Sequence, residues 1–233
     1  MAVYPYAITT VVTPPAAGDL IDIDTWKDDW SVTTTDDDGF IARTIARCSM
    51  AVGQYCNRTF GIATYQDIIR PERSGRLGGI VPGGRNPIQV SRFPLVSVAS
   101  VAETDGTTAT ILAEGADYEV NYALGQAYRL DANGNPRNWP ECEITIIYQA
   151  GYVLPGQAAT TFPNALALPV DIQDATGRLA FARYSERRRD PYIRSQSITA
   201  GGTTSYWEGH GASGNLTPDI QDLLDNYRVP LVG

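Results

Sequence analysis

Lysine is almost absent from this sequence. Of its 18 basic residues only Lys27 is a lysine, and 26 acidic residues leave a formal net charge of -8. An acidic balance argues against a dedicated DNA- or RNA-binding surface, because such surfaces usually carry a basic excess. Arginine forms planar, bidentate ion pairs and is favoured at interfaces. The bias is therefore a mild indication of an assembly protein, although genome base composition would produce the same bias.

Cysteines and long apolar runs are also scarce. Three cysteines without framework spacing predict free thiols in a reducing compartment: Cys48, Cys56 and Cys142. No run approaches the roughly 18 apolar residues that a membrane span needs. The N-terminal stretch MAVYPYAITT has neither the basic region nor the apolar core of a signal peptide. We therefore expect no membrane span and no signal peptide.

Residues that carry catalysis are poorly represented. The single histidine, His210, lies in a loop rich in glycine and serine, where a histidine is more often solvated than a general base. The cysteines form no CxxC pair, and no serine or cysteine stands in a nucleophile elbow. The Gly-rich stretch 73–87 lacks the Gly-Lys-Ser or Gly-Lys-Thr end of a P-loop. We expect no enzyme activity, no cofactor and no metal.

Helical periodicity is clear at both ends of the chain. It predicts helices over about 37–57, 170–189 and 217–228, and a shorter helix that is capped by Asp24. The acidic run Asp36–Asp38 is interpreted as the N-terminal cap of the first long helix rather than as a metal site. The expected core positions of the two long helices are Phe40, Ile41, Ile45, Cys48, Val52 and Tyr55, and Ile172, Ala175, Leu179, Phe181 and Ala182.

Residues 63–152 show a different pattern. Short β-rich runs alternate in polarity and are separated by Gly-containing turns, which predicts an antiparallel unit of five or six strands. The predicted fold class is α+β, a small helical bundle with an inserted antiparallel β lobe. The predicted parts are an extended arm at 1–18, a helical part at 19–62, the β lobe at 63–152, a linker and C-terminal helices at 153–228, and a tail at 229–233.

Several short segments between residues 19 and 228 follow one another in a distinctive order. They are DLIDIDTWKDDW, DDDGFI, QYCNRTF with Asn57, Arg58 and Phe60, SRFPLVSV, ITIIYQAGY, LPVDIQDATGRLAFARYSER and LLDNYR. Each segment alone is weak evidence of a resemblance to any family. In this order the chain resembles the head-to-tail connector (adaptor) proteins of tailed bacteriophages and gene transfer agents.

The resemblance implies a structural role in a virion, after assembly in the host cytoplasm. Members form a ring homo-oligomer, usually a dodecamer, beneath the portal protein, and the next tail-side connector, a stopper or tail protein, follows it. DNA passes through the ring without sequence-specific binding. The C-terminal segment is expected to contact the portal through Tyr227, Arg228, Val229, Pro230, Leu231, Val232 and Gly233. The long arm and the large β lobe depart from smaller members, so their partners stay open.

The arginine-rich stretch YSERRRDPYIRS allows three interpretations. Arg187, Arg188 and Arg189 fall in the last turn of a helix that Pro191 ends, where cations complement the helix dipole. Some of them, together with Arg183 and Arg194, would alternatively pair with acids of an adjacent subunit or of the portal. Lining of the DNA channel is the third interpretation.

A different function class is also open. The β lobe would be a binding module for a saccharide or a host surface, with aromatic residues that serve equally well as core: Tyr118, Tyr122, Tyr128, Trp139 and Trp207. A hydrolase is the third class, and it would depend on His210.

Overall fold

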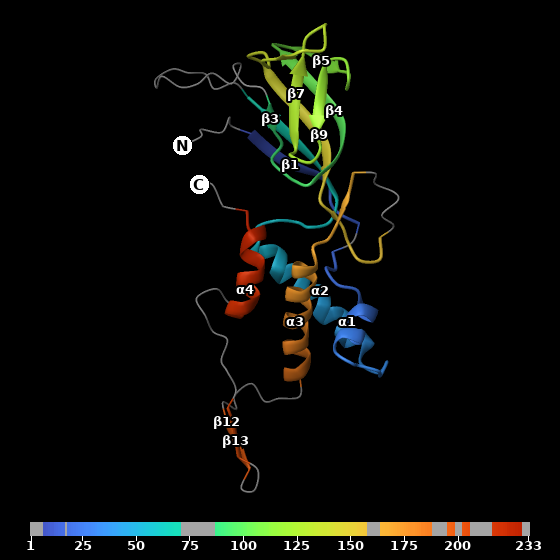
Figure 1. Ribbon diagram of the computed structural model, residues 1–233, viewed down its shortest axis with the longest axis vertical. Helices are drawn as coiled ribbons and strands as arrows, with labels where there is room; N and C mark the ends of the chain where they lie inside the picture. Colours follow the sequence, from blue (N-terminus) through green and yellow to red (C-terminus); the bar gives the residue numbers. More distant parts are fainter. Residues whose placement is uncertain are drawn as a thin grey trace, which may run out of the picture. The chain divides into compact units, whose positions relative to one another are not determined.

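The structure is a computed structural model that describes residues 7–16, 18–70, 87–157, 164–187, 195–198, 202–205 and 216–229. The chain forms two compact units (Figure 1). The β unit comprises Met1–Ala17, Gly61–Val153 and Gln157–Ala167, and the helical unit comprises Gly18–Phe60, Leu154–Gly156 and Leu168–Gly233. Helices and antiparallel sheets occur together, so the predicted α+β class is confirmed.

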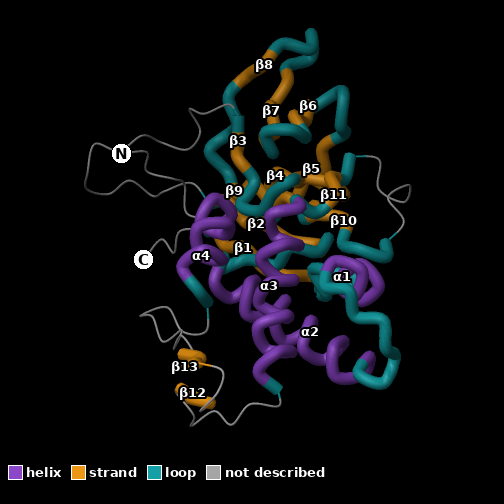
Figure 2. The backbone as a smooth tube through the Cα atoms, turned by 60° about the horizontal axis from the view of Figure 1, so that its bottom comes forward, coloured by secondary structure: helices purple, strands orange, loops and turns teal. Residues whose placement is uncertain are grey.

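The helical unit contains four α-helices and a short 3-10 turn among its described residues. They are α1 (Ile23–Asp29), α2 (Asp38–Tyr55), α3 (Val170–Glu186), α4 (Pro218–Leu224) and the turn Asp225–Tyr227. Helix α3 packs against both α2 and α4 (Figure 2). A backbone hairpin of β12 (Ser195–Ile198) and β13 (Gly202–Ser205) belongs to the same unit.

The helix ends differ in detail from the predictions. The cap of α1 is Asp22 rather than Asp24, because the Asp22 carboxylate accepts hydrogen bonds from the backbone N–H groups of Asp24 and Thr25 at 3.0 and 3.3 Å. Helix α3 ends at Glu186 with Arg187 as its C-cap. The structure does not describe Arg188 and Arg189, which were predicted for the last turn.

The apolar stripes of α2 and α3 form the core of the helical unit. Four of the six positions expected on α2 are buried: Ile41, Ile45, Cys48 and Val52. On α3 the expected Ile172, Ala175 and Leu179 are buried, whereas Ala182 is exposed and Ala180 is buried in its place. The prediction for Ala182 was wrong because two alanines separated by 200° of helix turn could not be ranked by hydrophobicity alone.

A tryptophan of α1 packs against α3. The side chain of Trp26 is fully buried, and its indole N–H donates to the carbonyl oxygen of Gly177 at 3.1 Å. A Cβ at Gly177 would lie 3.4 Å from the Ile21 side chain and 3.7 Å from Trp26, which are ordinary van der Waals distances. On the same side of α3 the ring of Phe181 stacks on Trp30, with a centroid separation of 3.9 Å.

The β unit contains two antiparallel sheets. The order of the larger one is β1 (Ala7–Thr13), β2 (Ala63–Ile69), β9 (Glu143–Ala150), β4 (Leu95–Asp105) and β5 (Thr108–Leu112). In the smaller one β7 (Gln126–Leu130) lies between β3 (Ile88–Gln89) and β6 (Tyr118–Asn121), and β8 (Pro136–Arg137) also pairs with β7. A short parallel pair joins β10 (Tyr152–Val153) to β11 (Leu166–Ala167).

Two features of the β unit differ from the prediction. Strand β1 lies in the segment predicted as an extended arm, and it pairs with β2 from Ala7↔Ile69 to Thr13↔Thr64. The number of strands also exceeds five or six, because short strands such as β8 lie in segments where two residues give no visible alternation. Strands β2 and β9 do alternate as predicted, and their buried side chains enter a common core.

A polar contact within this core fixes a loop. The carboxylate of Asp67 is fully buried and accepts hydrogen bonds from the Tyr148 hydroxyl at 3.0 Å and from the Ser91 backbone N–H at 2.8 Å. The Tyr148 hydroxyl accepts from the backbone N–H of Arg92 at 3.1 Å. Burial, together with the charge of Asp67, raises the pKa of Tyr148 far above its ordinary value. The loop between β3 and β4 is thereby tied to β2 and β9.

Candidate functional site

The helical segments among those that resemble connector proteins contact one another in the helical unit. Trp26 of DTWKDDW contacts Gly177 of the α3 segment. Asp37 of the acidic run contacts Tyr184 and Arg187 at the other end of α3. The end of α2, within QYCNRTF, contacts the segment that begins at LLDNYR. Segments far apart in the sequence are therefore contact partners.

An acidic and aromatic cluster surrounds the end of α3. The Asp37 carboxylate accepts hydrogen bonds from the Tyr184 hydroxyl, at 3.0 Å, and from the Arg187 guanidinium. The guanidinium carbon lies 4.6 Å from the Tyr184 ring centroid and 5.5 Å from that of Phe40, as in cation–π contacts. The hydrogen bond to Asp37 raises the pKa of Arg187.

The acidic run begins α2 as predicted, with Asp38 in the first turn, but the predicted side-chain cap is missing. Asp37 is the N-cap residue of α2, but its side chain makes no capping hydrogen bond. Its carboxylate is instead part of the contact with α3, and the carboxylate of Asp38 accepts from Lys27 Nζ at 2.7 Å. A short sequence cannot distinguish a capping carboxylate from one that reaches a partner 150 residues away.

Two of the five arginines predicted for an interface are described. Arg187 pairs with Asp37 of its own chain, and Arg183 lies on α3 close to Cys48. Burial raises the pKa of the Cys48 thiol, and the charge and hydrogen bond of Arg183 oppose that rise. Arg188, Arg189 and Arg194 lie outside the described residues.

The C-terminal segment is held at the end of α2. The Val229 N–H donates to the Cys56 carbonyl oxygen at 2.9 Å, and the Asn57 side-chain amide donates to the Val229 carbonyl oxygen at 3.2 Å. Asn57 has a φ of 52°, in the left-handed region that commonly ends a helix. We call this contact set, formed by Tyr55, Cys56 and Asn57 with residues 224–229, the C-terminal clamp.

Side chains reinforce the C-terminal clamp. The Tyr55 hydroxyl donates to Asp225 Oδ1 at 2.6 Å, and the Arg228 guanidinium carbon lies 5.2 Å from the Tyr55 ring centroid. The thiol of Cys56 is fully buried and donates to the Leu224 carbonyl oxygen at 3.9 Å. Burial raises the pKa of this thiol to about 11, so it stays protonated at neutral pH.

The structure thus places three of the seven residues expected to contact a portal. The Tyr227 hydroxyl donates to Asp171 of α3 at 3.2 Å, while Arg228 and Val229 belong to the C-terminal clamp. Residues Pro230, Leu231, Val232 and Gly233 lie outside the described part of the chain. An asparagine after a helical stretch can be recognised in the sequence as a helix-end signal, and Asn57 is left-handed in the structure. Its contact with Val229, 172 residues later, could not be recognised in this way.

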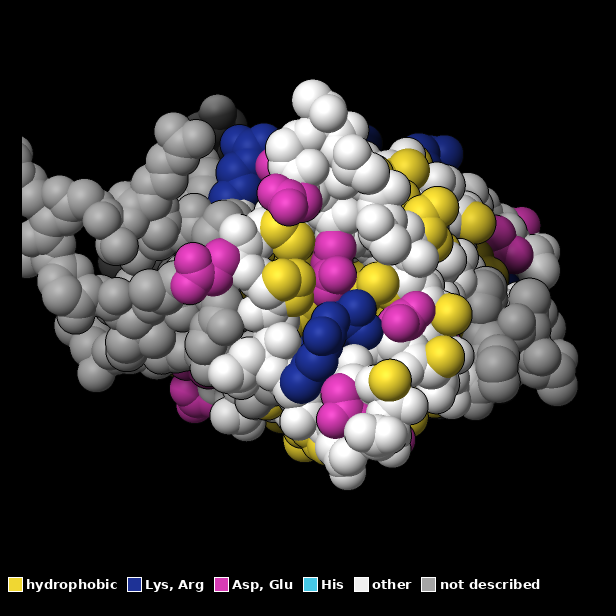
Figure 3. Space-filling model, turned by 90° about the horizontal axis from the view of Figure 1, so that it is seen from above, with side chains coloured by type: hydrophobic (Ala, Val, Ile, Leu, Met, Phe, Trp, Pro, Cys, Tyr) yellow, Lys and Arg dark blue, Asp and Glu magenta, His cyan; other side chains and the backbone are white. Residues whose placement is uncertain are grey.

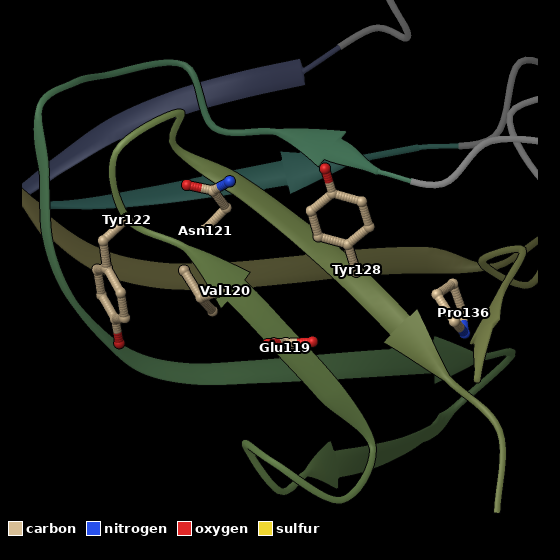
Figure 4. Close-up of a pocket in the computed structure, with 6 residues that line it drawn as sticks. All are labelled: Glu119, Val120, Asn121, Tyr122, Tyr128 and Pro136. Carbon is tan, nitrogen blue, oxygen red and sulfur yellow. The ribbon is translucent and has the colours of Figure 1, made fainter. Parts of the chain in front are cut away.

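The aromatic residues considered for saccharide binding divide into two groups. Tyr118 and Trp139 are buried in the core of the β unit. Tyr122 and Tyr128 instead line a pocket of about 430 Å³ together with Glu119, Val120, Asn121 and Pro136 (Figure 4). Trp207 and His210 fall in a segment that the structure does not describe.

Several simpler features follow from the described residues alone. All three cysteines are free thiols, as predicted. No helix in the described ranges is both long enough and apolar enough to cross a membrane. Nor do the side chains placed by the structure include three or more His, Cys, Asp or Glu residues grouped as a metal site. On the face shown in Figure 3, the described basic side chains are interspersed with acidic and hydrophobic ones.

Comparison with known proteins gives matches at the level of the fold. No family model and no curated protein matches the sequence. The fold is similar to neck chains of gene transfer agent particles. One comes from the neck of an empty particle solved with C6 symmetry, with 16% identity, a TM-score of 0.49, and coverage of 97% of this chain and 98% of that chain. Chains from a native particle's virion and from its neck solved with C12 symmetry have the same identity and coverage and TM-scores of 0.47.

A pair of substitutions at Asn57 tests the C-terminal clamp. Asn57→Gly retains the left-handed backbone and removes the side-chain hydrogen bond, which we expect to cost about 1 kcal/mol. Asn57→Ala also strains the backbone, at a further cost of about 1–2 kcal/mol. Hydrogen exchange of the C-terminal peptide should therefore be slowest in the unmodified chain and fastest in Asn57→Ala.

The matched control is Thr59→Ala, an exposed neighbour of the clamp. We expect its exchange profile to equal that of the unmodified chain. Equal protection of Val229 in all four proteins would show that Asn57 does not hold the C-terminal segment.

Proposed function

We propose that this protein is a structural adaptor at the head-to-tail junction of a phage-type particle. Copies of the chain form a ring, taken to be a dodecamer, under the portal protein, and the next tail-side connector binds below. The ring continues the DNA channel and catalyses no reaction. The observation that carries the proposal is that segments resembling those of connector proteins contact one another in the helical unit, and that the end of α2 holds the C-terminal segment.

The C-terminal clamp supports a docking role for the last residues. Its last described contact joins Val229 to Cys56 and Asn57, which follow the last residue of α2. The remaining sequence, PLVG, is apolar and short, as a docking peptide would be. Tyr227, Arg228 and Val229 then position the tail, and Pro230–Gly233 insert into the portal.

The larger sheet supports lateral contacts between subunits. Its outer strands, β1 (AITTVVT) and β5 (TATIL), contain no charged residue, although edge strands are commonly protected by charge. Val11, Val12 and Ile111 are 54, 53 and 75% exposed on these strands. Because the two edges are different surfaces, one edge of a subunit would contact the other edge of the next subunit. Such a heterologous contact forms a closed ring when the rotation between neighbouring subunits allows it.

The charge of the chain is compatible with passage of DNA. Each phosphate contact by a cation adds to salt-dependent binding, so a strongly basic channel would retain DNA. The net charge of -8 and the mixed charges on the face in Figure 3 favour sliding over retention. We therefore propose a virion location at the head–tail interface, reached after assembly in the host cytoplasm, with no sequence-specific contact to DNA.

Deleting Pro230–Gly233 tests the docking role without removing the C-terminal clamp. We expect the truncated chain to keep its thermal midpoint and its ring formation, and to lose binding to purified portal, measured by sedimentation of mixtures. A chain in which the same four residues become a glycine–serine segment of equal length should also lose binding, because the apolar side chains are missing. Undiminished portal binding by both variants would refute the tail assignment.

The structure describes Arg187 of the arginine run but not Arg188 and Arg189, and the two parts are tested separately. Replacing Arg188 and Arg189 with glutamine leaves the Arg187–Asp37 pair intact. If these cations, with Arg183 and Arg194, meet acids on a neighbouring subunit or the portal, sedimentation velocity should show weaker ring assembly at an unchanged thermal midpoint. Arg187→Gln is the matched control and should lower the midpoint. A loss confined to DNA retention would instead assign Arg188 and Arg189 to the channel.

A further inference from the structure

We propose that the outer face of the small sheet in the β unit, formed by β6, β7 and β8, binds a neutral saccharide. The proposal does not depend on ring formation or on the portal. It commits to a pyranose-containing ligand, recognised by the ring of Tyr128 and by the polar side chains on either side of it.

Strand register places the binding groups on one face. Glu119 of β6 pairs with Tyr128 of β7, and Asn121 pairs with Gln126, so these four side chains alternate outward together. The adjacent pair Tyr118↔Arg129 alternates to the opposite face, where both side chains are buried. Pro136 of β8 pairs with Leu130 and borders the same outer face (Figure 4).

The ring of Tyr128 is held in place at the centre of this face. Its hydroxyl donates to Gln126 Oε1 at 2.9 Å, and the side chain is half-buried between its neighbours. A fixed aromatic ring offers a flat apolar surface to the C–H face of a sugar and loses little conformational entropy on binding.

The flanking groups supply hydrogen bonds for hydroxyl groups. Among the described side chains, none pairs with the Glu119 carboxylate, which is exposed and can accept two hydrogen bonds. The Asn121 carbonyl oxygen accepts from the Leu124 N–H at 3.2 Å, which directs its amide N–H₂ group as a donor. An acceptor and a donor on the same face as an aromatic ring match the hydroxyl groups and the apolar face of a sugar.

Tyr122 also lines the pocket, and it packs against the core of the β unit. The Tyr122 hydroxyl donates to Glu114 at 3.0 Å, and burial together with this hydrogen bond raises the pKa of Tyr122 to about 12. The Tyr122 hydroxyl therefore stays protonated over the physiological range.

Size and charge narrow the class of ligand. The pocket volume of about 430 Å³ lies within the range of small-ligand sites and fits one or two sugar rings. No lysine or arginine is among the residues that line it, and Glu119 adds negative charge. Phosphorylated or acidic sugars are therefore disfavoured. A basic peptide would also suit a carboxylate beside an aromatic ring, and the test distinguishes it from a saccharide.

The test uses the full chain and four neutral disaccharides: maltose, cellobiose, lactose and chitobiose. We expect saturation-transfer NMR to detect at least one of them at millimolar concentration. Tyr128→Ala should weaken that binding by about tenfold or more, and Glu119→Gln by several-fold, because an aromatic contact or a charge-assisted hydrogen bond contributes roughly 1–2 kcal/mol. Thermal midpoints of the variants confirm that each one folds.

Leu124→Ala is the matched control, because Leu124 is an exposed apolar residue that does not line the pocket. We expect it to bind as the unmodified chain does. Absence of binding for all four disaccharides at roughly 10 mM would overturn the proposal. So would binding that survives Tyr128→Ala, or capture of an oligolysine peptide by the same residues in place of sugar. Ring assembly is measured separately, so either proposal can fail alone.

Discussion

The helical unit depends on the contact between Trp26 and Gly177. The two residues are 151 positions apart, and the β unit lies between them in the sequence. The indole is fully buried, and its N–H donates to the Gly177 carbonyl oxygen of α3 within the core. This contact fixes α1 against α3, and α2 packs directly against α3 through its own apolar face.

The remaining long-range contacts of the unit extend the same principle. Asp37 and Arg187 link the start of α2 to the end of α3, and the C-terminal clamp links the end of α2 to the segment after α4. Each contact joins two of the segments that resemble connector proteins. These segments stand on both sides of the inserted β unit in the sequence, because both parts of the chain must contact each other to complete the helical unit. In this account the C-terminal tail is positioned by the whole unit, since its anchor on Cys56 and Asn57 follows from the placement of α2.

The sequence predicted the helices and strands better than it predicted which distant residues contact one another. Periodicity identified α2, the core of α3 and the alternating strands β2 and β9, because burial of one face imposes those patterns directly. It misassigned Asp37 as a capping side chain and did not find the pairing of β1 with β2, because both depend on residues distant in the sequence. For the same reason Asn57 was recognisable as part of a motif, whereas its hold on Val229 was not. On the outer face of β6 and β7, the aromatic residues were named in advance, but only the register separated Tyr128 from the core residue Tyr118.

The central claim is that copies of this chain form a ring on a portal. Electron microscopy of the full chain mixed with the portal protein of the same particle tests it most directly. The account predicts a closed ring seated coaxially on the narrow end of the portal, with the C-terminal residues of each subunit at the contact. Free monomers beside undecorated portals, or attachment at any other surface of the portal, would contradict it.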